Sequence, residues 1–340
     1  MLRKSCINRP KLSKLTKSVK TQISSKTYVR FEPSHQKLIC LIFSVLITGG
    51  AGDGDTTKTE VVDLEGQRLC TSKYGAFPQK NERGMSEYFA RFPIVCGGGV
   101  PVNQITNQCW KFSNNKWVEF LKLEEDKWEA ASVISNGRLL ITNGYGSNDF
   151  SKISQAIDRS LVQVENGPFI DERMAGHCIV KTMTGPSKIL VIHRDGFNEI
   201  RDESFNRLKD GPSPKYSRRS SGCGSFFSSK HDSREVIVVF GGEMDGEGDT
   251  KHKTVEVWDF TKEGSTWELL NENLPVPMAG RPEVIRSLDS KSVWIIFEKN
   301  IYKFHIEDDQ YKFTKSSVEL NVSRQFFSAI PIPIYSVIKC

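Results

Sequence analysis

The chain has 340 residues, of which 38% are hydrophobic and 26% are charged, and its formal net charge is +6. These proportions are ordinary for a soluble globular protein, and they exclude collagen, a coiled coil and a protein with several membrane spans. The length accommodates one large domain or two domains of average size.

The positive charge is concentrated at the start of the chain. Residues 1–37 hold ten Lys/Arg and one acid, so this segment carries +9 and the remaining 303 residues carry −3. Because the segment is rich in Ser, Thr and Lys and poor in large apolar side chains, we expect residues 1–43 to form a disordered basic tail with an apolar end. Such a tail can contact RNA, DNA or anionic lipid, whereas we expect no nucleic acid on the rest of the chain.

An apolar run ends this tail. It extends from Leu38 to Ile47 and is ten residues long. A membrane-spanning helix needs about 20 residues, so no stable membrane span is predicted. Ten residues match the apolar core of a secretory signal, although the basic segment before them is longer than that of a standard signal. Two interpretations remain open: a signal whose true start lies near Lys37, and a buried β-strand formed by Val45 to Thr48.

A motif then recurs along the chain, in which an apolar run ends in a pair of glycines. Self-similarity of this kind indicates a repeat architecture. Glycine suits the end of such a run because it lets the backbone turn with a positive φ at little cost. The predicted structural glycines are Gly49 and Gly50, Gly97 and Gly98, Gly241 and Gly242, and Gly144, which follows Asn143 in an imperfect copy.

Two further features accompany the glycine pairs. A basic residue opens a strand before each unit, and these residues are Arg83, Lys127, Arg173, Arg219, Arg281 and Arg324, at spacings of 44, 46, 46, 62 and 43. Strands with aromatic or β-branched residues are predicted at Val61–Leu64, Cys109–Phe112, Leu161–Val164 and Val255–Phe260, and Trp117 and Trp267 follow two of them. Alternating patterns of this kind indicate half-buried strands. Six units are the number expected of a closed propeller with four-stranded blades.

The order of apolar run, Gly-Gly, aromatic strand and Trp resembles the Kelch repeat over about residues 44–340. The resemblance implies an all-β fold, a six-bladed Kelch-type β-propeller, and we expect a stand-alone Kelch protein without a BTB domain. We expect each Trp to fill the wedge between neighbouring blades. The units at Val191–Arg194 and Trp294–Glu298 lack the glycine pair.

The two ends of the predicted propeller complement each other. The segment from Arg324 to Pro333 resembles the opening strand of a blade but no glycine pair follows it, whereas Gly49 and Gly50 have no opening strand before them. We therefore expect a domain over residues 44–340 in which both ends complete one blade.

The eight cysteines include no CxxC pair and no zinc spacing with histidine. Cys96 and Cys109 flank a predicted hairpin. They can form a disulfide if their Cα atoms lie within about 7 Å and the protein is secreted. The alternative is two buried free thiols.

We expect no catalytic residue, no metal site and no cofactor. The glycine-rich segment from Gly49 to Asp55 is followed by neither a helix nor a Walker lysine. His177 and His193 fall in one predicted blade without a carboxylate partner. The acidic loop with Glu243, Asp245, Glu247 and Asp249 lacks the closing Glu of an EF-hand, so we interpret it as a solvated, partner-facing loop.

We expect a monomeric, non-catalytic module that binds another protein through loops on one propeller rim, since loops held by a rigid scaffold commonly carry function. Two alternatives stay open: a propeller enzyme with an unrecognised central site, and a nucleic-acid or membrane binder that acts through the basic tail. The apolar run and the cysteines favour the secretory route, and the cytoplasm is the alternative.

Overall fold

The computed structural model describes residues 6–8, 38–40, 44–52, 54–70, 74–100, 104–147, 149–151, 153–169, 174–243, 253–271, 273–278 and 280–333. The chain divides into two units, residues 1–42 and residues 43–340. In the first unit, β1 (Cys6–Asn8) pairs with the antiparallel β2 (Leu38–Cys40). The predicted disorder of the basic tail otherwise concerns residues outside those described.

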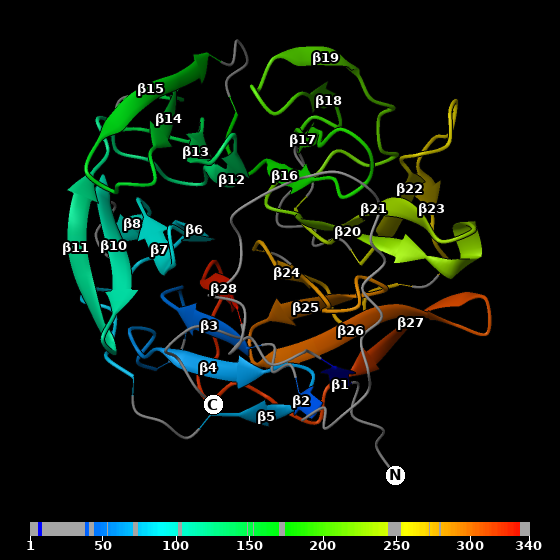
Figure 1. Cartoon of the computed structure of the whole chain (residues 1–340), viewed down its shortest axis with the longest axis horizontal. Coiled ribbons are helices and arrows are strands. Elements are labelled where there is room, and N and C mark those ends of the chain that lie inside the picture. Colours follow the sequence, from blue (N-terminus) through cyan, green and yellow to red (C-terminus); the bar gives the residue numbers. More distant parts are fainter. Residues whose placement is uncertain are drawn as a thin grey trace, which may run out of the picture. The chain divides into compact units, whose positions relative to one another are not determined.

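The second unit is a ring of six four-stranded antiparallel sheets, which we call blades 1 to 6 (Figure 1). The predicted six-bladed, all-β propeller is therefore confirmed. Blade 1 contains β28 (Ser328–Ile332), β3 (Ser44–Thr48), β4 (Glu60–Asp63) and β5 (Arg68–Leu69), and blade 2 contains β6 (Met85–Phe89), β7 (Phe92–Cys96), β10 (Gln108–Ser113) and β11 (Lys116–Lys122). Blade 3 contains β12 (Ala131–Ser135), β13 (Arg138–Thr142), β14 (Ile153–Ile157) and β15 (Val164–Phe169), and blade 4 contains β16 (Cys178–Lys181), β17 (Ile189–Ile192), β18 (Asn198–Arg201) and β19 (Arg207–Asp210). Blade 5 contains β20 (Gly222–Ser228), β21 (Arg234–Phe240), β22 (Val255–Asp259) and β23 (Glu268–Leu269), and blade 6 contains β24 (Glu283–Arg286), β25 (Val293–Phe297), β26 (Asn300–Glu307) and β27 (Gln310–Lys315).

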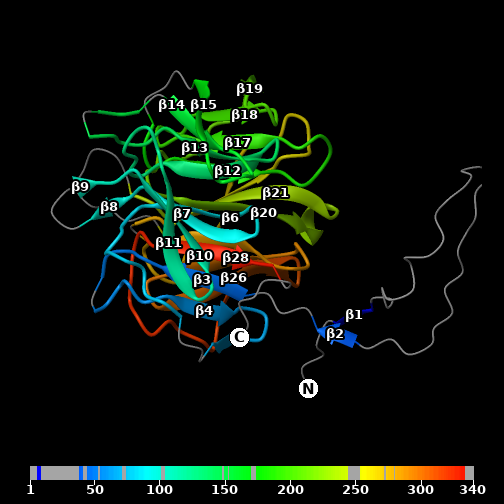
Figure 2. The same ribbon diagram turned by 60° about the vertical axis from the view of Figure 1, so that its left-hand side comes forward.

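The first strand of each sheet lies nearest the centre of the ring, and neighbouring inner strands contact one another (Figure 1). These inner strands are β6, β12, β16, β20, β24 and β28. Outside the blades, β8 (Gly99–Val100) and β9 (Gln104–Ile105) form a small hairpin that extends beyond the sheet of blade 2 (Figure 2). The described part of the chain contains one 3₁₀ turn, η1 (Ser229–His231), and no helix in it is long and apolar enough to span a membrane.

Blade 1 joins the two ends of the propeller. The late strand β28 pairs with the early strand β3 in antiparallel register, with Ser328 opposite Thr48 and Ile332 opposite Ser44. All five residues of β3 are buried, so the apolar end of the run from Leu38 to Ile47 is a central strand of this sheet.

The hydrophobic core lies between the blades, not within them. Each of the six buried clusters among the described residues combines side chains of two neighbouring blades. Trp117 packs edge-on against Phe77 at a centroid distance of 4.9 Å and joins Leu46 and Ile330 of blade 1. Trp267 joins the cluster between blades 4 and 5. Both tryptophans therefore fill the wedge between blades.

The glycine pairs lie where neighbouring blades approach most closely. Gly50 and Gly98 have φ values of +97° and +98°, which are costly for any residue with a Cβ. The second glycine of each pair donates its N–H to a backbone carbonyl of the next blade. The acceptors are Asn81 for Gly50 at 2.5 Å, Lys127 for Gly98 at 2.7 Å, Met174 for Gly144 at 2.7 Å and Met278 for Gly242 at 3.0 Å.

Buried polar side chains support these turns by donating hydrogen bonds to the carbonyl of the first glycine. Arg324 Nη1 donates to the carbonyl of Gly49 at 3.3 Å, and Arg218 Nη1 donates to that of Gly241 at 3.1 Å. Asn81 Nδ2 does the same for Gly97 at 2.9 Å. Arg324 also pairs with Glu60 at 2.6 Å, and Arg218 pairs with Glu256, all four side chains being buried.

Two details of the predicted repeat are wrong. The basic residues do not occupy one structural position: Arg324 and Lys127 are buried before their inner strands, and in blade 5 the equivalent of Arg324 is Arg218, not the half-buried Arg219. In blade 3 the third strand is β14, not Leu161–Val164. Leu161 instead has a φ of +60° in the turn between β14 and β15, and β14 begins nine residues after Gly144, close to the ten that separate Gly98 from β10.

Two disulfides join pairs of described cysteines. Cys96 and Cys109 lie directly opposite each other on β7 and β10 and form the predicted bond. Cys178 on β16 is bonded to Cys223 on β20, which links the inner strands of blades 4 and 5. The sequence analysis missed this second bond because the two residues are 45 positions apart. Cys70 is also disulfide-bonded.

Gly50→Ala should be far more destabilising than Gly54→Ala, although the two glycines have φ values of +97° and +93°. A Cβ on Gly50 would lie 2.7 Å from the Gln325 carbonyl oxygen, whereas a Cβ on Gly54 meets nothing within 4 Å. We expect urea unfolding to give a loss of about 1 kcal/mol for Gly54→Ala and about 3 kcal/mol for Gly50→Ala. Equal losses would contradict the role of close approach between the strands.

Arg218→Met should remove about 3–5 kcal/mol from the free energy of unfolding, because it leaves the buried Glu256 carboxylate without its cation. The matched control is Arg138→Met, which breaks the exposed 2.8 Å pair with Glu165 and should cost less than about 1 kcal/mol. Tryptophan fluorescence during urea unfolding measures both. A loss for Arg218→Met as small as that of the control would refute the bracing role.

Candidate functional site

A single residue adopts a left-handed backbone conformation two or three positions ahead of each inner strand. These six residues, which we call the collar, are Arg83, Glu129, Gly176, Ser220, Gly280 and Phe326, with φ values between 52° and 79°. Consecutive members are hydrogen bonded through their backbones: Arg83 N to Phe326 O at 2.8 Å, Glu129 N to Arg83 O at 3.3 Å, Gly176 N to Glu129 O and Ser220 N to Gly176 O, both at 2.9 Å. Left-handed residues other than glycine cost about 1–2 kcal/mol each, so these four hydrogen bonds hold a strained arrangement in place.

Side chains also connect the residues of the collar. Arg83 forms an ion pair with Glu129. Its guanidinium also lies 3.9 Å from the ring centroid of Phe326 and 4.5 Å from that of Trp128, which are favourable cation–π distances. The cavity beside these side chains is only about 10 Å³, so the central channel is closed at this end.

The residues that follow the glycine pairs fold back beside the collar. Isolated bridges join Ala51 to Gln325, Gly99 to Glu82, Tyr145 to Trp128 and Glu243 to Arg219. Each partner is the residue immediately before a collar residue. We call the surface formed by the collar and these bridged loops the loop face. Its loops are fixed by backbone pairing at four blades.

An aromatic cluster stands on the loop face. Tyr145 lies between Trp128 and Phe150, with centroid distances of 5.7 Å and 4.3 Å. All three rings are half-buried, so part of each remains in contact with solvent. Arg83 lies against Trp128 from the collar side. The cluster therefore combines three aromatic rings and an oriented guanidinium on one surface.

The predicted partner-facing loop is only partly described. Glu243 begins it and forms an ion pair with Arg219 at 2.7 Å, whereas Asp245, Glu247 and Asp249 lie outside the described residues. The sequence analysis did not identify Trp128, Tyr145 or Phe150. A sequence signal for this cluster was present: Trp128 lies just before an inner strand, and two further aromatic residues follow Gly144 in the next loop.

Beyond the collar, the inner strands enclose a central channel of about 440 Å³. Four charged side chains line it: Glu87 on β6, Glu283 and Arg286 on β24, and Arg281 just before β24. Burial raises the pKa of both Glu87 and Glu283 to about 7, and the Glu283 charge further raises that of Glu87. No sequence pattern joins these residues, because only the closed ring brings β6 and β24 to one channel.

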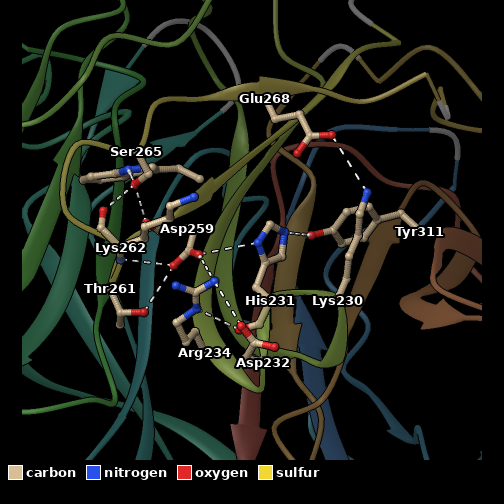
Figure 3. Close-up of polar contacts among 11 residues, drawn as sticks. Lys230, His231, Asp232, Arg234, Asp259, Thr261, Lys262, Ser265, Glu268 and Tyr311 are labelled. Carbon is tan, nitrogen blue, oxygen red and sulfur yellow. Dashed lines mark hydrogen bonds and ion pairs between the residues drawn. The ribbon is translucent and has the colours of Figure 1, made fainter.

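A second polar cluster lies between blades 5 and 6 (Figure 3). His231 Nε2 is 2.9 Å from the Tyr311 hydroxyl, and His231 Nδ1 is 3.5 Å from Asp259 Oδ2. The order of acid, imidazole and hydroxyl is that of a nucleophile relay. However, burial raises the pKa of Tyr311 to about 12, and its ring stacks on Phe304 at 5.4 Å. This cluster therefore serves to join the two blades.

The two histidines of blade 4 lie close enough for their charges to interact, but each contacts a different group. His177 Nε2 is 2.8 Å from Thr142 Oγ1, and burial lowers the pKa of His177 well below its usual value. His193 lies 3.8 Å from Glu199 instead, so it has the carboxylate neighbour that the sequence analysis did not find. Within the described ranges, no group of three His, Cys, Asp or Glu residues could hold a metal ion.

The chain is similar in structure to the protein in the solved structure titled "Structure of YjhT". The match has a TM-score of 0.60 at 16% sequence identity and covers 80% of this chain and 97% of that one. At this identity the likeness concerns the fold. No family model and no curated protein matches the chain. The comparisons and the strand order therefore agree on a six-bladed β-propeller.

The channel carboxyls predict a pH dependence of stability. Their folded pKa of about 7 exceeds the ordinary value of 4.5, so the stability that they contribute is complete below pH 4.5 and is lost as the pH rises to about 7. The Glu87→Gln/Glu283→Gln variant should therefore gain about 1–3 kcal/mol relative to wild type between pH 4.5 and pH 8. Urea unfolding across this range measures the difference. The exposed control Glu263→Gln should show none, and a flat difference for the double variant would contradict the burial of the carboxyls.

Proposed function

We propose that this chain is a Kelch-type propeller that binds another protein through its loop face. The observation that carries the proposal is the cluster of Trp128, Tyr145 and Phe150 beside Arg83, at ring distances of 5.7 Å and 4.3 Å. Trp, Tyr and Arg are the residues most enriched among those that dominate binding energy at protein interfaces. Half-buried rings offer a partner apolar area while their orientation is already fixed.

The rigidity of the loop face supports the same function. The bridge between Trp128 and Tyr145 has N–H to carbonyl distances of 2.8 Å in both directions, and Arg83 is held between Trp128 and Phe326. Ordering a mobile side chain at an interface costs about 0.5–1.5 kcal/mol. Side chains that are already fixed avoid most of this cost, so a partner gains more free energy per contact.

The disulfides favour a partner in the secretory pathway or outside the cell. Cys96–Cys109 and Cys178–Cys223 are both formed, and such bonds persist mainly in oxidising compartments. We therefore place the proposed binding activity in such a compartment.

Tyr145→Ala should weaken partner binding roughly 30-fold without unfolding the propeller. Truncation of a central aromatic residue typically costs at least about 2 kcal/mol of binding free energy, or roughly 30-fold in affinity. The matched control is Val162→Ala, which removes an apolar side chain of the same blade that is 75% exposed and lies at the β14–β15 turn, opposite the loop face. Both variants and wild type would be immobilised and exposed to secreted protein, and bound species would be identified and their affinities measured.

The proposal expects at least one protein that wild type and Val162→Ala retain equally and that Tyr145→Ala binds more weakly. Circular dichroism would establish that all three are folded. Equal retention of every bound protein by the two variants would refute the assignment of the loop face.

A further inference from the structure

The central channel is a separate feature from the loop face. The channel is closed at the collar. Each inner strand runs away from the collar toward the opposite face of the propeller, where Leu288 and Pro331 line the wall of the channel. The volume of about 440 Å³ falls within the range of small-molecule sites. A ligand would therefore enter from the side opposite the loop face.

Two arginines contribute positive charge to this channel. Arg281 Nη1 donates to the carbonyl of Ala130 at 3.0 Å. Because Arg281 belongs to blade 6 and Ala130 to blade 3, on opposite sides of the ring, this side chain spans the channel just beyond the collar. It forms the floor of the cavity.

Arg286 is fixed higher on the wall. Its Nε donates to Ser225 O at 3.0 Å, and its Nη2 donates to Ser225 Oγ at 2.8 Å and to Lys181 O at 3.3 Å. All three acceptors are neutral. Among the described residues, no carboxylate lies within 4.0 Å of Arg281 or Arg286, in contrast to the buried Arg218 and Arg324. The two guanidiniums are therefore held in place by neutral groups, and neither charge is matched by a contacting anion.

The carboxyls of Glu87 and Glu283 do not supply that anion below pH 7. Burial keeps Glu87 and Glu283 protonated up to about pH 7. The lining of the channel holds Glu87, Glu283, Arg281, Arg286 and Lys181, which is paired with Glu203 at 2.9 Å. Glu129, which is paired with Arg83, and the buried His177 lie near Arg281. Glu235 accepts hydrogen bonds from the backbone of Met183 and Thr184, and its charge acts on Arg286 from the wall. Below pH 7 the interior of the channel is thus net positive.

We propose that the central channel binds a small organic acid, whose anionic group is held by Arg281 and Arg286. The contact with Ala130 uses only Nη1 of Arg281, so its Nε and Nη2 can bind a carboxylate or a phosphate through two parallel N–H donors. Arg286 would add a single donor, Nη1, because its Nε and Nη2 are bonded to Ser225 and Lys181. The half-buried Ser132 and the carboxyl O–H groups of Glu87 and Glu283 would offer hydrogen bonds to the rest of the ligand. This activity would be additional to partner binding on the loop face.

The same groups give the site a pH dependence. As the pH rises through about 7, Glu87 and Glu283 ionise beside the arginines, which cancels the positive charge and repels an anion. Binding should therefore be tight at pH 5.5 and at least tenfold weaker at pH 8.5.

Calorimetric titration of the full chain with succinate at pH 5.5 and pH 8.5 tests the proposal. Inorganic phosphate in a second titration distinguishes a preference for phosphate from one for carboxylate, and the uncharged succinamide is the control for shape. We expect one site per chain for at least one of the two anions, weaker binding at pH 8.5 and no heat from succinamide. Absence of binding by both anions at pH 5.5 would overturn the proposal.

Variants separate the channel from adventitious surface binding. Arg286→Gln should weaken binding at least tenfold, whereas Arg159→Gln, an exposed arginine on the β14–β15 turn, should leave it unchanged. Glu87→Gln should bind as wild type does at pH 5.5 and should lose less affinity than wild type at pH 8.5, because only Glu283 then ionises, so it tests the site even if Arg286→Gln does not fold. Unchanged binding in Arg286→Gln, or an unchanged loss at pH 8.5 in Glu87→Gln, would refute the assignment.

Discussion

Each blade depends on its neighbours because its sheet is apolar on both faces. The strand β3 illustrates this: Val45 and Ile47 point into the cluster shared with blade 6, whereas Leu46 between them points into the cluster shared with blade 2. A single blade would leave one of these faces in water, at a cost of about 25 cal/mol per Å². The ring therefore has to close, and the pairing of β28 with β3 removes the last two exposed faces.

Close packing of the blades explains the unusual backbone near the axis. Room for a side chain runs out where the blades converge, and a Cβ on Gly97 would lie 2.5 Å from the carbonyl oxygen of Lys127 in the next blade. The glycine turn in turn needs internal support. Asn81, Arg218 and Arg324 provide it from equivalent positions with different chemistry, because the carbonyl of the first glycine requires only a buried donor.

Because different donor residues can support the glycine turn, the sequence predicts some features of the fold and not others. The glycine pairs could be predicted because glycine alone fits their geometry, and Cys96 and Cys109 could be paired because a single hairpin separates them. The bracing position could not be identified as a repeat, since Asn occupies it in blade 2 and Arg in blades 1 and 5. The collar residues Arg83, Glu129 and Phe326 share a conformation but no chemistry, and the strand β14 lay in a stretch with no aromatic signal. Glu87 and Glu283 meet only through ring closure, which no local pattern records.

The collar lies between the loop face and the central channel, so it determines whether binding at one affects binding at the other. Glu129 belongs to both, since it pairs with Arg83 below the aromatic cluster and lines the small cavity beside Arg281 and Glu283. Energetic coupling between sites requires an element with two arrangements that both ligands bias. Backbone hydrogen bonds join five of the six collar residues in sequence, from Phe326 to Ser220, so the collar favours one arrangement. A partner on the loop face and an anion in the channel would then bind independently, each to a surface that the closed ring has already formed.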